Sequence, residues 1–106
     1  MDEKQLEVLQ TSHDFLIKNI TPWPLNDILY SDSILTNDDV IRLQKEVTPN
    51  DQNRMLLVNM LPKATRPATF SSLLTALKKT EQHFIADYLQ QQLEKGKNYV
   101  YFADKL

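Results

Sequence analysis

Ser12, His13 and Asp14 are consecutive and supply the three side-chain types of a hydrolytic catalytic triad. Their spacing argues against that chemistry, because adjacent side chains on a helix diverge by about 100° and cannot align for proton transfer. The same residues interrupt an apolar stripe, which is typical of a bend in a solvated helix. We therefore interpret them as a helix bend and not as a catalytic site.

Two further sets of residues have the chemistry of metal ligands but not the spacing. His83 has no second histidine or cysteine at ligand spacing, and the chain contains no cysteine. Asp38 and Asp39 are adjacent, but no glycine-bearing loop or later bidentate glutamate accompanies them, as a calcium site would require. The sequence therefore predicts no metal, no cofactor and no enzymatic residue, and it favours helix capping for the two aspartates.

Aromatic residues raise the alternative of a ligand-binding or base-stacking surface. Trp23 lies between two prolines, which favours packing over a turn between helices. Tyr99, Tyr101 and Phe102 lie near the C-terminus, where docking on the domain and docking on a partner are equal alternatives. These residues do not point to an enzyme.

Composition predicts that helices position all of these side chains. The 106 residues include one glycine, whereas Rossmann turns, phosphate-binding loops and tight β turns all depend on glycine. A hydrophobic content of 42% is sufficient for one compact domain. The expected fold class is all-α, a compact bundle of about six short helices with neighbours antiparallel or at steep angles.

Apolar periodicity and capping residues place the first four helices. A helix over residues 3–20 should bend at residues 11–13, and a second should cover about residues 25–31. Thr36 should cap a third helix. Thr48 should cap a fourth, which begins with a proline at its first position.

Two more helices complete the predicted bundle. Pro67 should occupy the first position of the fifth helix, and Thr80 should cap the sixth. The segment beyond Gly96 has no helical stripe, so we place the domain at residues 1–95 and a C-terminal extension or linker at residues 96–106. The residues expected to face the core are Leu6, Leu9, Phe15, Leu16, Ile20, Leu25, Ile28, Leu29, Val40, Leu43, Val47, Met55, Leu57 or Val58, Leu61, Phe70, Leu73, Leu74, Leu77, Phe84, Ile85, Tyr88, Leu89 and Leu93.

Charge and hydropathy exclude several classes of function. There are 12 Lys plus Arg against 14 Asp plus Glu, and a net charge of -2 argues against general nucleic-acid binding. Acids and bases occur throughout the first twenty residues, unlike in a signal peptide. No segment approaches the ~18 to 20 apolar residues of a membrane span. We expect a soluble, cytoplasmic protein that binds neither nucleic acid nor membrane.

Surface charge is the remaining feature that could carry a function. The second and third predicted helices carry four aspartates, Asp27, Asp32, Asp38 and Asp39. Five cations fall mainly on the first, fourth and fifth predicted helices, namely Lys18, Arg54, Lys63, Lys78 and Lys79. If the bundle separates these groups, the acidic face of one molecule could meet the basic face of another, which would set orientation and association rate. The alternative is a mixed, solubilising surface.

The segment from Ile34 to Leu89 resembles a caspase recruitment domain (CARD), a six-helix member of the death-fold superfamily. The resemblance is carried by SDSILT at 31–36, TPNDQNRMLLVNMLP at 48–62 and ATFSSLLTALKKTEQHFIADYL at 68–89. The opening MDEKQLEVL is most like CARDs of apoptotic protease-activating factors, while the last segment is similar to initiator-caspase prodomains. The match covers roughly residues 3–93 and rests on the order and lengths of the helices.

The resemblance implies a Greek-key helical bundle, with a bent first helix, that binds other CARDs. In the family such binding gathers caspases on an oligomeric platform, where proximity activates them. A basic surface on helices one and four of one CARD meets an acidic surface on helices two and three of another. The domain itself would not be catalytic, although it could be part of a larger caspase or ATPase.

The chain matches the two binding surfaces of the family at only some positions. Asp27 matches an acidic position of the platform side, but Val40 replaces a further acid. Arg54 matches a caspase arginine, whereas His13 and Asn50 stand where other arginines are expected. The resemblance therefore favours an acidic, platform-like or adaptor-like CARD. The predicted partner-binding residues are Asp27, Asp32, Asp38, Asp39, Arg54, His13, Asn50, Lys18 and Lys63.

Three hypotheses remain open at this stage. The first is a homotypic CARD–CARD interaction module of apoptotic or innate immune signalling, whose partner is an initiator caspase, an apoptosome-type platform, an adaptor or a second copy. The second is a small helical DNA-binding or regulatory domain, suggested by the helix-turn-helix appearance around KEVTPND. The negative charge, and Arg54 as the only cation of the would-be recognition helix before Lys63, count against it. The third is another death-fold adaptor with a different partner.

Overall fold

A computed structural model describes the backbone of residues 1–105 and the side chains of residues 1–95. In this part of the chain all regular secondary structure is helical, and loops join the helices. The elements are α1 (Glu3–Thr11), α2 (His13–Asn19), α3 (Pro22–Ser31), α4 (Asn37–Lys45), α5 (Pro49–Arg54), the π-helix η1 (Met55–Met60), the 3-10 helix η2 (Leu61–Lys63), α6 (Thr69–Lys79) and α7 (His83–Lys105). Helices α1 and α2 form one bent unit, and α5, η1 and η2 form another. The predicted all-α bundle of six helical units is confirmed for these residues.

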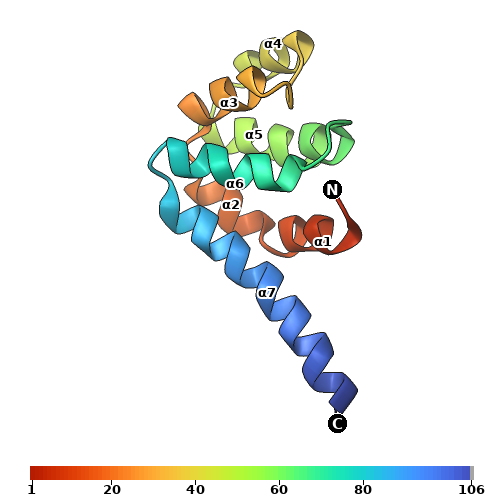
Figure 1. Cartoon of the computed structure of the whole chain (residues 1–106). Coiled ribbons are helices and arrows are strands. Elements are labelled where there is room, and N and C mark those ends of the chain that lie inside the picture. The colour runs from red at the N-terminus through yellow and green to blue at the C-terminus, as the bar shows by residue number, and fades with distance from the viewer. Residues whose placement is uncertain (106) are drawn as a thin grey trace.

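The packing of the helices places α3 and α4 away from α1. Helix α6 packs against α3 and α7, α2 packs against α5, and α1 packs against α7. Figure 1 shows α3 and α4 together at one end of the molecule and α1 toward the other, with α7 extending beyond the bundle. Surfaces on α3 and α4 are therefore remote from surfaces on α1.

Capping side chains begin the third and fourth units as the sequence predicts. The Thr36 hydroxyl oxygen accepts a hydrogen bond from the Asp39 backbone N–H at 3.1 Å, and the Asp39 carboxylate accepts one from the Thr36 N–H at 3.0 Å. The Thr48 hydroxyl oxygen likewise accepts from the Asp51 N–H at 3.1 Å, with Pro49 at the first position of α5. These bonds satisfy backbone donors that the first turn of a helix leaves unpaired.

The predicted starts of the last two helices are wrong. Helix α6 begins at Thr69 instead of Pro67, because Ala68 has left-handed backbone angles (φ 60°, ψ 30°) that a helix cannot continue through. Thr80 ends α6 instead of beginning α7. Its hydroxyl donates to two carbonyl oxygens in the last turn of α6, at 2.9 and 3.1 Å, and α7 begins at His83.

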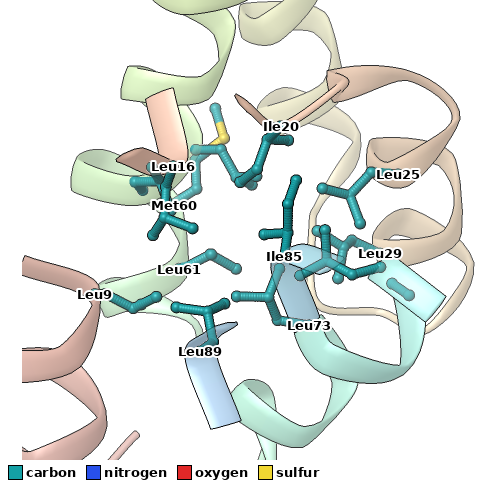
Figure 2. Close-up of a cluster of buried hydrophobic side chains, with 14 of the residues drawn as sticks. Leu9, Leu16, Ile20, Leu25, Leu29, Met60, Leu61, Leu73, Ile85 and Leu89 are labelled. Carbon is teal, nitrogen blue, oxygen red and sulfur yellow. The ribbon is translucent and has the colours of Figure 1, made fainter. Parts of the chain in front are cut away.

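The core is one cluster to which all six helical units contribute buried apolar side chains. Figure 2 shows side chains from α1, α2, α3, α6, α7 and the π and 3-10 segments converging on a common centre. Trp23 is half-buried against this cluster, in agreement with its predicted place over a turn. The fully buried leucines are Leu16, Leu25, Leu29, Leu43, Leu56, Leu61, Leu73, Leu77 and Leu89.

Two residues expected in the core are exposed. Val47 is 92% exposed because α4 ends at Lys45, so the valine no longer follows the apolar stripe of that helix. Phe84 is 72% exposed, although its ring lies 6.0 Å from that of Phe15 at the edge of the core. The error at Val47 comes from extending the stripe past the end of α4, whereas Phe84 lies in the first turn of α7, at the margin of the packed cluster.

The apolar residues of η1 and η2 are buried largely as the sequence predicts. An α-helical period predicted Met55, one of Leu57 and Val58, and Leu61. Leu57 and Leu61 are buried and Met55 is half-buried against the core, whereas Val58 is 52% exposed. Leu56 is also fully buried, and the prediction missed it.

Helix α7 continues past Gly96 to Lys105, where no helical stripe was recognised in the sequence. The side chains of Tyr99, Tyr101 and Phe102 lie outside the described part, so the two alternatives for them stay predictions. The domain boundary at residue 95 likewise stays a prediction.

Candidate protein interaction surfaces

The acidic surface consists of Asp27 on α3 and Asp38 on α4, flanked by Asp32 and Asp39. Asp27 and Asp38 are exposed, and α3 packs against α4, so the two carboxylates belong to neighbouring helices. Among the described side chains, none of these four aspartates forms an ion pair. Arg42 follows Asp38 by four residues on α4 but is not paired with it, so these carboxylates remain available to a cationic partner.

The two flanking aspartates, Asp39 and Asp32, are less free to meet a partner than Asp27 and Asp38 are. Asp39 is half-buried and forms part of the α4 cap described above. Asp32 ends α3 and lines a polar depression of about 520 Å³ that Arg66 and Ser72 also line. Because a guanidinium shares that depression, Asp32 adds less net negative charge to the surface than Asp27 and Asp38 do.

The predicted cationic residues lie on the other units, and two of them are paired. Lys18 Nζ lies 2.9 Å from a carboxylate oxygen of Asp14, and Arg54 Nη1 lies 2.6 Å from one of Asp51. All four side chains are about half exposed or more, so each pair is worth only about 0 to 1 kcal/mol. Each pair nevertheless reduces the positive potential that a partner would meet.

Of the remaining predicted residues of this side, Lys63 is the only lysine or arginine. Lys63 is exposed at the end of η2, and it forms no ion pair among the described side chains. Asn50 is exposed in the first turn of α5 and is neutral. His13 is half-buried and lines an apolar groove. Each of the two surfaces therefore keeps exposed charge without an ion pair among the described side chains, Asp27 and Asp38 on one and Lys63 on the other.

An apolar groove of about 420 Å³ lies between the bent first unit and the π segment. We call it the α1–η1 groove. Its walls are formed by Leu6, Leu9 and His13 on one side and by Leu57, Val58 and Pro62 on the other.

The residues that first suggested chemistry are not arranged for it. Ser12 is buried at the bend between α1 and α2, whereas Asp14 is exposed and paired with Lys18. Within the described side chains, no group of three or more His, Asp or Glu residues could hold a metal ion. No helix in the described part has both the length and the apolar character to cross a bilayer.

A family model for the caspase recruitment domain matches residues 6–92. The chain belongs to the caspase recruitment domain (CARD) family. This CARD is therefore a homotypic protein-interaction module of apoptotic or inflammatory signalling, and the CARD fold is itself non-catalytic. No curated protein sequence matches the chain significantly.

Two exposed apolar residues on the acidic side of this CARD were missed by the sequence analysis. Tyr30 on α3 is 43% exposed and Ile41 on α4 is 49% exposed. The Tyr30 hydroxyl hydrogen-bonds the side-chain oxygen of Asn37, the first residue of α4. Their spacing in the sequence could have revealed them. Tyr30 follows Asp27 by three residues and Ile41 follows Asp38 by three, so each shares a helix face with a predicted binding residue.

Proposed function

We propose that this CARD binds the CARD of another protein through the acidic surface of α3 and α4, and thereby recruits or assembles caspases. The partner would be an initiator caspase, an apoptosome-type platform or an adaptor in cytoplasmic apoptotic or innate immune signalling. One observation carries the proposal. Asp27 and Asp38 are exposed and form no ion pair among the described side chains, while Lys18 and Arg54 are each paired with a neighbouring aspartate.

Complementary charge would set the orientation and rate of this association more than its affinity. A single exposed ion pair contributes about 0 to 1 kcal/mol, so several pairs must act together to hold two CARDs. Repetition of the contact in an assembly would add further strength, because each additional contact forms at high effective concentration.

The test is a double charge reversal, Asp27→Lys with Asp38→Lys, assayed by calorimetric titration against the purified CARD of an initiator caspase. We expect binding to weaken by at least about tenfold, which corresponds to about 1.4 kcal/mol. The matched control is Asp87→Lys on α7, an exposed aspartate that does not belong to the acidic surface. Binding within about twofold of the wild type in the double variant would refute the acidic-surface proposal.

Asp39 is unsuited to this test, although the family resemblance also implicates it. Its carboxylate accepts the Thr36 N–H at 3.0 Å, so charge reversal would remove a helix cap together with the surface charge. Circular dichroism of the Asp27 and Asp38 variants should match the wild type, because neither side chain has a described hydrogen-bond partner. Asp38→Lys should lower the melting temperature slightly, because it places a cation in the first turn of α4.

The alternative of a DNA-binding domain has weaker support. Arg54 is the only cation of α5 and η1, the would-be recognition segment, and it is bonded to Asp51. Salt-sensitive binding of duplex DNA at micromolar protein in a gel-shift assay would revive that alternative.

A further inference from the structure

Three aromatic rings lie together where α2 meets the beginning of α7. Phe15 of α2 stacks on Tyr88 of α7, with ring centroids 4.1 Å apart and ring planes inclined by 24°. The ring of Phe84, one helical turn before Tyr88, lies 6.0 Å from that of Phe15 and is tilted to it by 54°. We call these three residues the aromatic patch.

The aromatic patch is open to solvent. Phe84 is 72% exposed, and Phe15 and Tyr88 are half-buried. A single exposed apolar side chain is normal on a protein surface, whereas contiguous exposed apolar groups mark an interaction site. Aromatic residues are also enriched at the buried centres of protein interfaces. The aromatic patch therefore has the composition of an interface centre.

Charges of both signs border the aromatic patch on α2. Asp14 directly precedes Phe15, and Lys18 follows Phe15 by three residues. The Asp14 and Lys18 side chains are 83% and 64% exposed, and their charged atoms lie 2.9 Å apart. Such an exposed ion pair contributes little to stability, so either charge can exchange its partner for one on another molecule.

We infer that the aromatic patch joins two copies of this chain in a symmetric dimer. A surface that binds its own copy across a two-fold axis must be complementary to itself. The aromatic patch meets this requirement, because rings occupy its centre and its α2 border carries one acid and one base. Across the axis, Asp14 of each copy lies opposite Lys18 of the other, which gives two reciprocal ion pairs.

The symmetric contact differs in kind from the contact of the proposed function. It uses α2 and α7, and it shares no residue with the acidic surface of α3 and α4. Because both copies use the same surface, the contact closes at two copies and does not repeat into a chain. The inference therefore does not depend on the proposed function.

The size of the aromatic patch predicts a weak dimer. A stable specific interface buries about 800 Å² on each partner, whereas one aromatic side chain contributes about 150 to 250 Å² when it is fully buried. Three rings that are already partly packed provide less area than a stable interface needs. We expect a dissociation constant on the order of 0.1 mM.

Sedimentation velocity of the 106-residue chain, over a concentration series up to about 1 mM, measures the self-association. We expect an equilibrium between monomer and dimer. Phe84→Ala removes the most exposed ring and should weaken dimerisation by at least about tenfold. Val47→Ala is the matched control, because it truncates a 92% exposed apolar side chain outside the aromatic patch.

Reversal of the two border charges tests the reciprocal ion pairs. Asp14→Lys leaves two cations on the α2 border and Lys18→Asp leaves two anions, so each variant should dimerise more weakly than the wild type. An equimolar mixture of these two variants should form heterodimers, because two cations then face two anions. Circular dichroism should show both variants folded. Each should melt slightly earlier than the wild type, since each removes a charge that favours its end of α2.

Three results would overturn the inference. They are a monomeric wild type at every concentration, equal effects of Phe84→Ala and Val47→Ala, and a mixture of the charge variants that associates no better than either alone. Growth beyond a dimer would also overturn it, because a two-fold contact closes at two copies. The proposed function keeps a separate test, since Phe84→Ala leaves Asp27 and Asp38 unchanged.

Discussion

The buried side-chain amide of Asn53 donates a hydrogen bond at 2.8 Å to the carbonyl oxygen of Ile20, the residue that ends α2. The same nitrogen donates at 2.9 Å to the carbonyl oxygen of Ile17. The last carbonyl groups of a helix have no partner within it, and here a side chain from α5 supplies one. The contact therefore joins the unit that carries Arg54 to the end of α2.

Replacing Asn53 by alanine should lower the free energy of unfolding by about 2 to 3 kcal/mol, because two buried carbonyl oxygens lose their donor. Denaturant unfolding measures the change. Asn50→Ala, an exposed asparagine in the same helix, should change it by less than about 0.5 kcal/mol. Equal effects of the two substitutions would show that the Asn53 bonds do not stabilise the fold.

Asp39 and Asp38 should differ in their contribution to stability. Both lie in the first turn of α4, so alanine at either position removes a similar interaction with the helix dipole. Asp39→Ala also removes the acceptor for the Thr36 N–H, and it should cost about 0.5 to 1 kcal/mol more than Asp38→Ala. Thermal unfolding of both variants measures the difference, and identical melting temperatures would contradict the cap.

The π segment makes a specific prediction about core residues. Leu56→Ala should cost about 2 to 5 kcal/mol, because the side chain is fully buried and leaves a cavity. Val58→Ala should cost less than about 1 kcal/mol, since half of that side chain is already in water. Equal costs of the two substitutions would contradict the difference in burial between Leu56 and Val58.

Asn26 should be replaceable with a gain in stability. Its side chain is fully buried in α3, and neither amide atom has a hydrogen-bond partner among the described residues. Asn26→Leu keeps the branched shape and removes the desolvation penalty, so the free energy of unfolding should rise by about 1 to 2 kcal/mol. A fall in stability would show that the amide is hydrogen-bonded in solution.

Binding through the acidic surface should be sensitive to salt. Raising sodium chloride from about 0.1 M to about 1 M shortens the Debye length from about 10 Å to about 3 Å. We expect the association constant with an initiator-caspase CARD to fall by about tenfold or more over that range. The melting temperature, measured in parallel, controls for folding. Salt-independent binding would indicate an apolar interface instead.

Local patterns in the sequence determined the helical fold and most of its boundaries. Thr36 and Thr48 cap helices through hydrogen bonds to residues three positions away. Such short-range pairs are visible in the sequence itself. The scarcity of glycine and the apolar period likewise depend on neighbours along the chain. The same information, with the family resemblance, placed Asp27 and Asp38 on successive helices.

Only the tertiary structure decided which side chains are buried, paired or open to a partner. Asn53 is buried, and its hydrogen-bond partners Ile17 and Ile20 are more than 30 residues away in sequence, so no local pattern reveals the contact. Leu57 is buried and Val58 is 52% exposed, although the apolar period of the sequence allowed either of them to face the core. The α1–η1 groove is lined by residues of the first unit and of the π segment, which are far apart in sequence. The position of α1 is in turn set by its packing against α7, near the other end of the chain. Such features arise from long-range packing, and a pattern of neighbouring residues therefore does not reveal them.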